Sequence, residues 1–161
     1  MDAWSNFFVG ELGAAAAFAG LLFVSVSVNL AKILELGRLA DRGLEALIML
    51  FLTVVVASLG LLPGQPLRAF GAEILFVALV ALALVVRLQR NYLAHVDAQY
   101  RTRWRRMAWV NAFAVFVFAA AGLAVAATGE PVGFYLLPIG VLLTFFAAGS
   151  NSWVLLIEIN R

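Results

Sequence analysis

Residues 13–34 of the chain read GAAAAFAGLLFVSVSVNLAKIL, an almost continuous apolar run studded with serines and one asparagine. Within it, residues 23–30 alternate apolar and polar side chains, as a half-buried β-strand does. An open strand cannot cross a bilayer, because its unpaired edge groups would lie in hydrocarbon. A bilayer core of about 30 Å requires about 17–25 residues of helix. The run therefore predicts a membrane-spanning helix.

The composition of the whole chain also indicates a membrane protein. Of its 161 residues, 65% are hydrophobic and 12% are charged, whereas a soluble domain has about half and about a quarter. A chain of this length has too little interior to hide so much apolar surface, so lipid must cover part of it. The N-terminal residues, MDAWSNFFVGE, lack a basic region, so we expect the first helix to be retained rather than cleaved.

Five apolar segments are long enough to cross the membrane. They are residues 11–33, 46–62, 69–86, 107–128 and 132–157. We therefore predict that residues 1–161 form one domain, an all-α bundle of five transmembrane helices. The second and third segments are short and joined by a Pro63-Gly64-Gln65-Pro66 turn, so a re-entrant pair is the alternative there. Pro138 predicts a kink or a late start of the fifth helix.

The basic residues predict the orientation of the bundle. Of the 11 lysines and arginines, only Arg68 lies on one predicted face, and the other ten lie on the opposite face. Because basic side chains concentrate on the cytoplasmic side, we predict the N-terminus outside and the C-terminus in the cytoplasm. Six arginines fall in the cytoplasmic basic loop 87–106, whose ends we expect to extend the flanking helices. Four of them are candidates for binding anionic lipid headgroups, the alternative being that they only fix topology: Arg101, Arg103, Arg105 and Arg106.

The sequence carries no signature of an enzyme. Its single histidine, His95, has no second ligand-type residue at metal spacing, and there is no cysteine. Phosphate-binding loops and the motifs of metalloproteases and serine hydrolases are also absent. We therefore expect a non-enzymatic protein without a metal or cofactor. The membrane accounts for the basic charge, so the sequence does not suggest nucleic-acid binding.

Polar side chains inside the predicted helices gather at one depth. Asn29, Asn111 and Asn151 each lie six or seven residues to the cytoplasmic side of their helix centre, about 10 Å below the midplane. Two polar stripes run from this layer toward the cytoplasm: Ser25, Asn29 and Lys32 on the first helix, and Thr144, Asn151 and Glu158 on the fifth. Lys32 and Glu158 are a possible ion pair. The layer is interpreted either as a hydrogen-bonded clamp between helices or as a path or site for a small ion or solute.

Two acids lie near the opposite, outer end of the predicted helices. Glu11 opens the first helix, and Glu73 lies about one turn inside the third. A carboxylate at such a depth is costly without water or a partner, which makes it a candidate for function. The pair predicts a vestibule that attracts cations; the alternative is a water-exposed Glu73 paired with Arg68.

Small residues at four-residue spacing predict close contacts between helices. They are Gly13 with Ala17, Ala16 with Gly20, and Ala148 with Ser152. Such contacts serve either packing within the bundle or association of copies. Because five helices rarely enclose a pore, we predict a homo-oligomeric channel or transporter for a small ion or solute, with the polar layer and the outer acids as pore or ligand-binding candidates. The alternative is a regulatory protein whose bundle or basic loop contacts another membrane protein.

Three stretches of the chain carry a resemblance to a known family. They are ELGAAAAFAGLLFVSVSVNLAKIL, then GLEALIML with LLPGQP and GAEIL, and finally NSWVLLIEINR. Together they resemble small bacterial inner-membrane proteins often labelled "modulator of FtsH protease". The resemblance implies a multi-pass helical fold in the bacterial inner membrane, with a membrane protease as a partner. It assigns no catalytic or binding residue.

Overall fold

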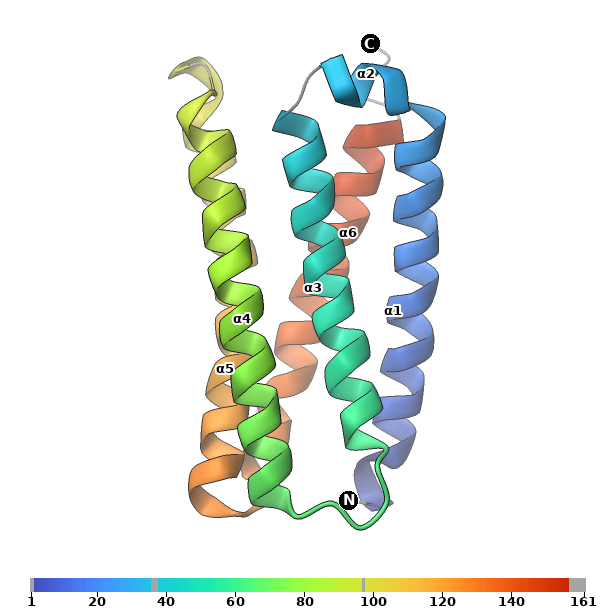
Figure 1. The fold of residues 1–161 in the computed structure, drawn as a ribbon, viewed down its shortest axis with the longest axis vertical. Helices are drawn as coiled ribbons and strands as arrows, with labels where there is room; N and C mark the ends of the chain where they lie inside the picture. The colour runs from blue at the N-terminus through green and yellow to red at the C-terminus, as the bar shows by residue number, and fades with distance from the viewer. Residues whose placement is uncertain (1, 36–37, 97, 157–161) are drawn as a thin grey trace.

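The computed structural model describes residues 2–35, 38–96 and 98–156. It confirms the all-α fold, with five helices that are long and apolar enough to cross a membrane. Figure 1 shows these helices side by side along the long axis. The elements are α1 (Asp2–Val28), α2 (Leu30–Glu35), α3 (Arg38–Gly60), α4 (Leu67–Ala94), α5 (Ala98–Thr128), the 3-10 helix η1 (Pro131–Leu136) and α6 (Leu137–Leu156). By the length and composition of its helices, the chain is a multi-pass membrane protein.

Helix α1 lies nearer the N-terminus of the chain than its apolar segment predicts. It begins at Asp2, so Glu11 lies more than two turns inside the helix instead of opening it. It ends at Val28, and Asn29 forms a turn in which its carbonyl accepts a hydrogen bond from the N–H of Ile33 at 3.0 Å. The short α2 then lies across this end of the bundle (Figure 1). Asn29 therefore lies at the break between α1 and α2, one residue beyond the apolar stretch Ala3–Val28, instead of inside a continuous helix as predicted.

The basic connection between the third and fourth crossings is helical over most of its length, as expected. Helix α4 continues to Ala94 and α5 begins at Ala98. The four arginines proposed to bind headgroups, Arg101, Arg103, Arg105 and Arg106, are exposed on the first turns of α5. We call this end of the bundle, which also carries α2 and the start of α3, the basic end.

The turn residues act as the sequence predicts. Helices α3 and α4 are both long enough to cross, which favours two crossings over a re-entrant pair. The turn between them includes Gly64, whose φ of +69° suits glycine. Pro138 is the second residue of α6, where its missing N–H costs no intrahelical hydrogen bond. The late start of that helix is thus confirmed.

Helix α3 lies at the centre of the packing. It contacts α1, α4 and α6, while α6 also contacts α1 and α5, and α4 pairs along its length with α5. At the end opposite the basic end, Phe8, Phe70 and Phe134 pack edge to face with ring centroids 5.6–5.8 Å apart. This aromatic cluster joins α1, α4 and η1, which lie far apart in the sequence.

Helices α4 and α5 approach each other closely at two glycines. A Cβ atom added to Gly122 would lie 2.5 Å from the backbone nitrogen of Leu75, and one added to Gly71 would clash with the backbone of Ala126. Of the small residues that the sequence singled out, Ala148 and Ser152 are buried in the bundle. The stripe on α1 is exposed, and nothing lies within 4 Å of a Cβ added at Gly13 or Gly20. Its role in association of copies stays a prediction.

Candidate functional site

Helix α3 carries two charged side chains into the interior of the bundle. Glu45 is fully buried and Arg42 is only 8% exposed. Neither is predicted from the sequence as a site residue, because the predicted apolar segment begins at residue 46 and leaves both outside the crossing. A signal was present: Arg42, Glu45 and Met49 recur at helical spacing with Thr53, which places all of them on one face.

Three neutral donors surround the carboxylate of Glu45. Gln89 Nε2 donates to Oε1 at 2.7 Å and Asn111 Nδ2 donates to the same oxygen at 3.1 Å, while the Tyr92 hydroxyl donates to Oε2 at 3.1 Å. Gln89 Nε2 also donates to the carbonyl of Ala108 at 2.8 Å. A buried carboxylate is tolerated only when its oxygens are hydrogen-bonded. The carboxylate therefore joins α3 to α4 and α5.

Arg42 joins the same region to α6. Its Nη2 donates to Asn151 Oδ1 at 2.8 Å and approaches Met107 Sδ at 3.6 Å. Its guanidinium lies over the Trp104 ring, 4.7 Å from the centroid, in a cation–π contact. Arg42 and Glu45 are three residues apart on α3 and attract each other electrostatically. We call the set the polar cluster: Arg42, Glu45, Gln89, Tyr92, Asn111 and Asn151.

The polar cluster takes in only part of the predicted polar layer. Asn111 and Asn151 belong to it, Asn111 through its hydrogen bond to Glu45 and Asn151 through its hydrogen bond from Arg42. The hydroxyl of Ser25 donates to the carbonyl of Leu21, one turn earlier in its own helix, at 2.7 Å. Thr144 is buried, and its hydroxyl has no hydrogen-bond partner in the part of the chain that the structure describes.

The outer acids lie in separate surroundings. The Glu73 carboxylate accepts a hydrogen bond from Gln65 Nε2, while the predicted partner, Arg68, has its side chain beside Gly129. Glu11 is half-buried and borders a void of about 10 Å³, too small for more than a single water. Lys32 is exposed on α2. Its predicted partner, Glu158, lies outside the described residues.

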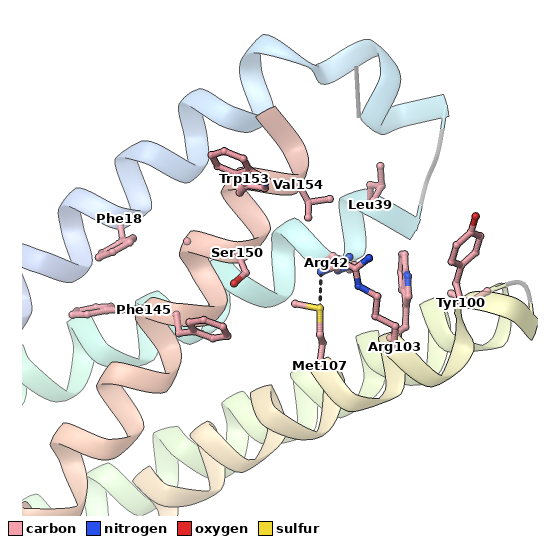
Figure 2. A pocket seen from close by; sticks show the side chains of 14 residues that line it. Phe18, Leu39, Arg42, Tyr100, Arg103, Met107, Phe145, Ser150, Trp153 and Val154 are labelled. Carbon is pink, nitrogen blue, oxygen red and sulfur yellow. Dashed lines mark hydrogen bonds between the residues drawn. The ribbon is translucent and has the colours of Figure 1, made fainter. Parts of the chain in front are cut away.

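A large cavity lies beside the polar cluster at the basic end. Its volume is about 1040 Å³. Figure 2 shows Arg42 in its middle, between α3, α5 and α6. The lining combines aromatic and aliphatic side chains with a few polar groups: Phe18, Leu39, Arg42, Val96, Tyr100, Arg103, Trp104, Met107, Phe145, Phe146, Gly149, Ser150, Trp153 and Val154. Of these residues the sequence predicts only Arg103 as a ligand contact, for lipid headgroups, because four separate elements and the α4–α5 connection contribute the lining.

No protein-family model, curated protein or solved structure matches this chain. What the site can do chemically therefore follows from its own residues alone. A buried arginine forms part of the cavity wall, and behind it a hydrogen-bonded glutamate holds α3, α4 and α5 together. Such an arrangement offers both charge and apolar surface to a molecule of suitable size.

Proposed function

We propose that the protein is a non-enzymatic membrane protein that binds a small molecule in the cavity at the basic end, as a step in its transport. The observation that carries the proposal is the cavity itself, at about 1040 Å³ with Arg42 in its wall. Ligand pockets typically measure about 300–1,000 Å³ and combine an apolar lining with a few placed polar groups. The cavity has both properties.

The polar cluster supports this proposal over conduction through the polar layer. Asn111 and Asn151 are hydrogen-bonded to Glu45 and Arg42 in a packed interior, which favours the clamp interpretation for these two residues. The clamp fixes Arg42 in place, so that its side chain is preorganised beside the cavity. In this proposal the cluster supports the ligand site and the ligand occupies the cavity.

Filling the cavity is expected to weaken binding at least about tenfold, equivalent to about 1.4 kcal/mol. Gly149→Phe places a ring in the cavity, and its Cβ would meet only the Phe18 ring, at an ordinary 3.8 Å. The Cβ of the new side chain therefore meets no backbone atom. Saturable fluorescence of the small neutral probe 1-aminoanthracene, titrated into protein in detergent, measures the affinity.

The matched control is Ala83→Phe, which adds the same ring on the exposed face of α4. It is expected to bind the probe as the unmodified protein does. Equal probe affinity in the Gly149→Phe protein would contradict the proposal.

We further propose that the basic end faces the cytoplasm of a bacterial cell, with the protein in the inner membrane. The chain has no cysteine, so single cysteines report topology without background. Gln99→Cys lies exposed at the basic end and Pro63→Cys lies exposed at the other. A membrane-impermeant maleimide added to intact spheroplasts is expected to label Pro63→Cys and to spare Gln99→Cys until the membrane is opened. The reverse pattern would contradict this orientation.

A second candidate function is interaction with an anionic partner at the membrane surface. The observation that favours it is the exposure of Arg101, Arg105 and Arg106 outside the cavity lining. If the protein acts by such contact, Arg101→Ala with Arg105→Ala should abolish co-purification of a membrane-protein partner and leave probe binding intact. Retained co-purification by this double variant would count against the second candidate.

A further inference from the structure

We infer that the cavity takes an anionic amphiphile from the bilayer, with its carboxylate or phosphate head on Arg42 and Arg103 and its chain along the aromatic end. This inference rests on the proposed function, because it names the class of molecule that the cavity binds. Three independent properties of the cavity carry it: its charge, its polarity gradient and its opening.

The first property is charge. Among the residues that the structure describes, two arginines and no acidic residue line the cavity. Glu45 attracts Arg42 but does not line the cavity, and its two oxygens are engaged by donors from α4 and α5. The described lining therefore offers two guanidinium groups to a ligand. Guanidinium groups bind carboxylate and phosphate through paired, charge-assisted hydrogen bonds.

The second property is a gradient of polarity along the cavity. Figure 2 shows Phe18 and Phe145 at one end and Tyr100 and Arg103 at the other. The rings of Phe18 and Phe145 stack with centroids 4.9 Å apart and belong to α1 and α6, within the apolar crossings. One end of the cavity is thus apolar and deep, and the other is polar and close to the basic end. An amphiphile in the adjacent leaflet is arranged in the same way, with its apolar chain deep in the membrane and its polar head near the surface.

The third property is the opening. Phe146 and Trp153 line the cavity, yet they are 68% and 57% exposed on the surface of α6. They lie in the apolar stretch Pro131–Val154, which is long enough to cross a membrane. The cavity therefore opens sideways, toward lipid. A molecule dissolved in the bilayer can enter there without first passing into water.

Quenching of Trp104 by brominated amphiphiles tests the inference. Trp104 lines the cavity and is half-buried, so it reports on the interior once Trp4, Trp109 and Trp153 are replaced by phenylalanine. The probes are dibromostearate and its neutral methyl ester, added to the full chain in detergent. A parallel arm uses brominated phosphatidylglycerol against brominated phosphatidylcholine. Saturable quenching is expected, with at least about tenfold tighter binding of the anionic member of a pair.

The charged contact is tested through Arg103, which is exposed and whose loss should not unfold the bundle. Arg103→Gln is expected to weaken binding of the anionic probe about tenfold and to leave binding of the neutral probe unchanged. The control is Arg90→Gln, which replaces an exposed arginine of α4 outside the cavity. It is expected to leave binding of both probes unchanged. If Arg103→Gln weakens binding of dibromostearate, the ligand is a free fatty acid; if it weakens binding of brominated phosphatidylglycerol, the ligand is a membrane phospholipid. Either result supports the inference.

Two results would overturn the inference, and they are distinguishable. Saturable quenching with equal affinity for charged and neutral probes, unaffected by Arg103→Gln, would reject the anionic head and leave the cavity as a binding site. No saturable quenching by any probe, together with unchanged 1-aminoanthracene binding in the Gly149→Phe protein, would reject the cavity as a site as well.

Discussion

Replacing Glu45 by alanine is expected to lower the free energy of unfolding by about 3–5 kcal/mol, the usual cost of removing one member of a buried charged pair. The substitution leaves Gln89, Tyr92 and Asn111 without their shared acceptor and removes the attraction between Glu45 and the buried Arg42. Because these side chains come from three helices, the loss spreads across the centre of the bundle. Reversible unfolding in mixed detergent micelles, followed by circular dichroism, gives the difference in free energy.

The size of this effect depends on the acceptor and not on the charge alone. Glu45→Gln retains one carbonyl oxygen for Gln89 and Asn111, and its amide nitrogen meets the Tyr92 hydroxyl, which accepts as well as donates. Its cost is expected to be smaller, about 1–3 kcal/mol. Glu130→Ala, an exposed acid in the connection before η1, is the control, and a change within about 0.5 kcal/mol is expected. Equal stabilities for Glu45→Ala and Glu130→Ala would show that the polar cluster does not hold the helices together.

Replacing Gly122 by alanine is expected to destabilise the protein by about 1–3 kcal/mol, although alanine is the better helix former. The new methyl group would lie 2.5 Å from the backbone nitrogen of Leu75 and 2.8 Å from the backbone oxygen of Gly71. Backbone atoms of a packed helix cannot move aside as a side chain can, so α4 and α5 must separate. The same micelle unfolding experiment measures the change.

The matched control substitution is expected to change the stability in the opposite direction. Gly13→Ala makes the same chemical change in α1, where nothing lies within 4 Å of the added atom. Removing a glycine from a helix interior at such a position stabilises by about 0.5–1 kcal/mol. If both substitutions stabilise the protein, the close approach of α4 and α5 is not present in the bilayer or micelle.

The sequence predicts some residues of the polar cluster and not others. Asn111 and Asn151 were identified from their depth in the helices, and both lie in the polar cluster. Glu45 was missed because it precedes the apolar segment by one residue, although a helical continuation places it on the face of Met49. Hydropathy indicates which residues suit contact with lipid, whereas a helix ends where its backbone hydrogen bonds end. A helix can therefore extend beyond its apolar segment. A charged residue one turn beyond an apolar segment therefore remains inside the bundle whenever neighbouring helices cover it.

The sequence by itself determined that the chain crosses a membrane as five helices, because lipid permits only backbone that satisfies its own hydrogen bonds and about 20 apolar residues are needed for each crossing. Only the tertiary structure decided which polar groups meet. Gln89, Tyr92 and Asn111 converge on Glu45 from two other helices, and no local pattern specifies the rotation of one helix against another. The cavity likewise exists only where four elements and a connection meet. Helix rotation is set by side-chain packing summed over all contacts, and that sum is available only when the helices are assembled.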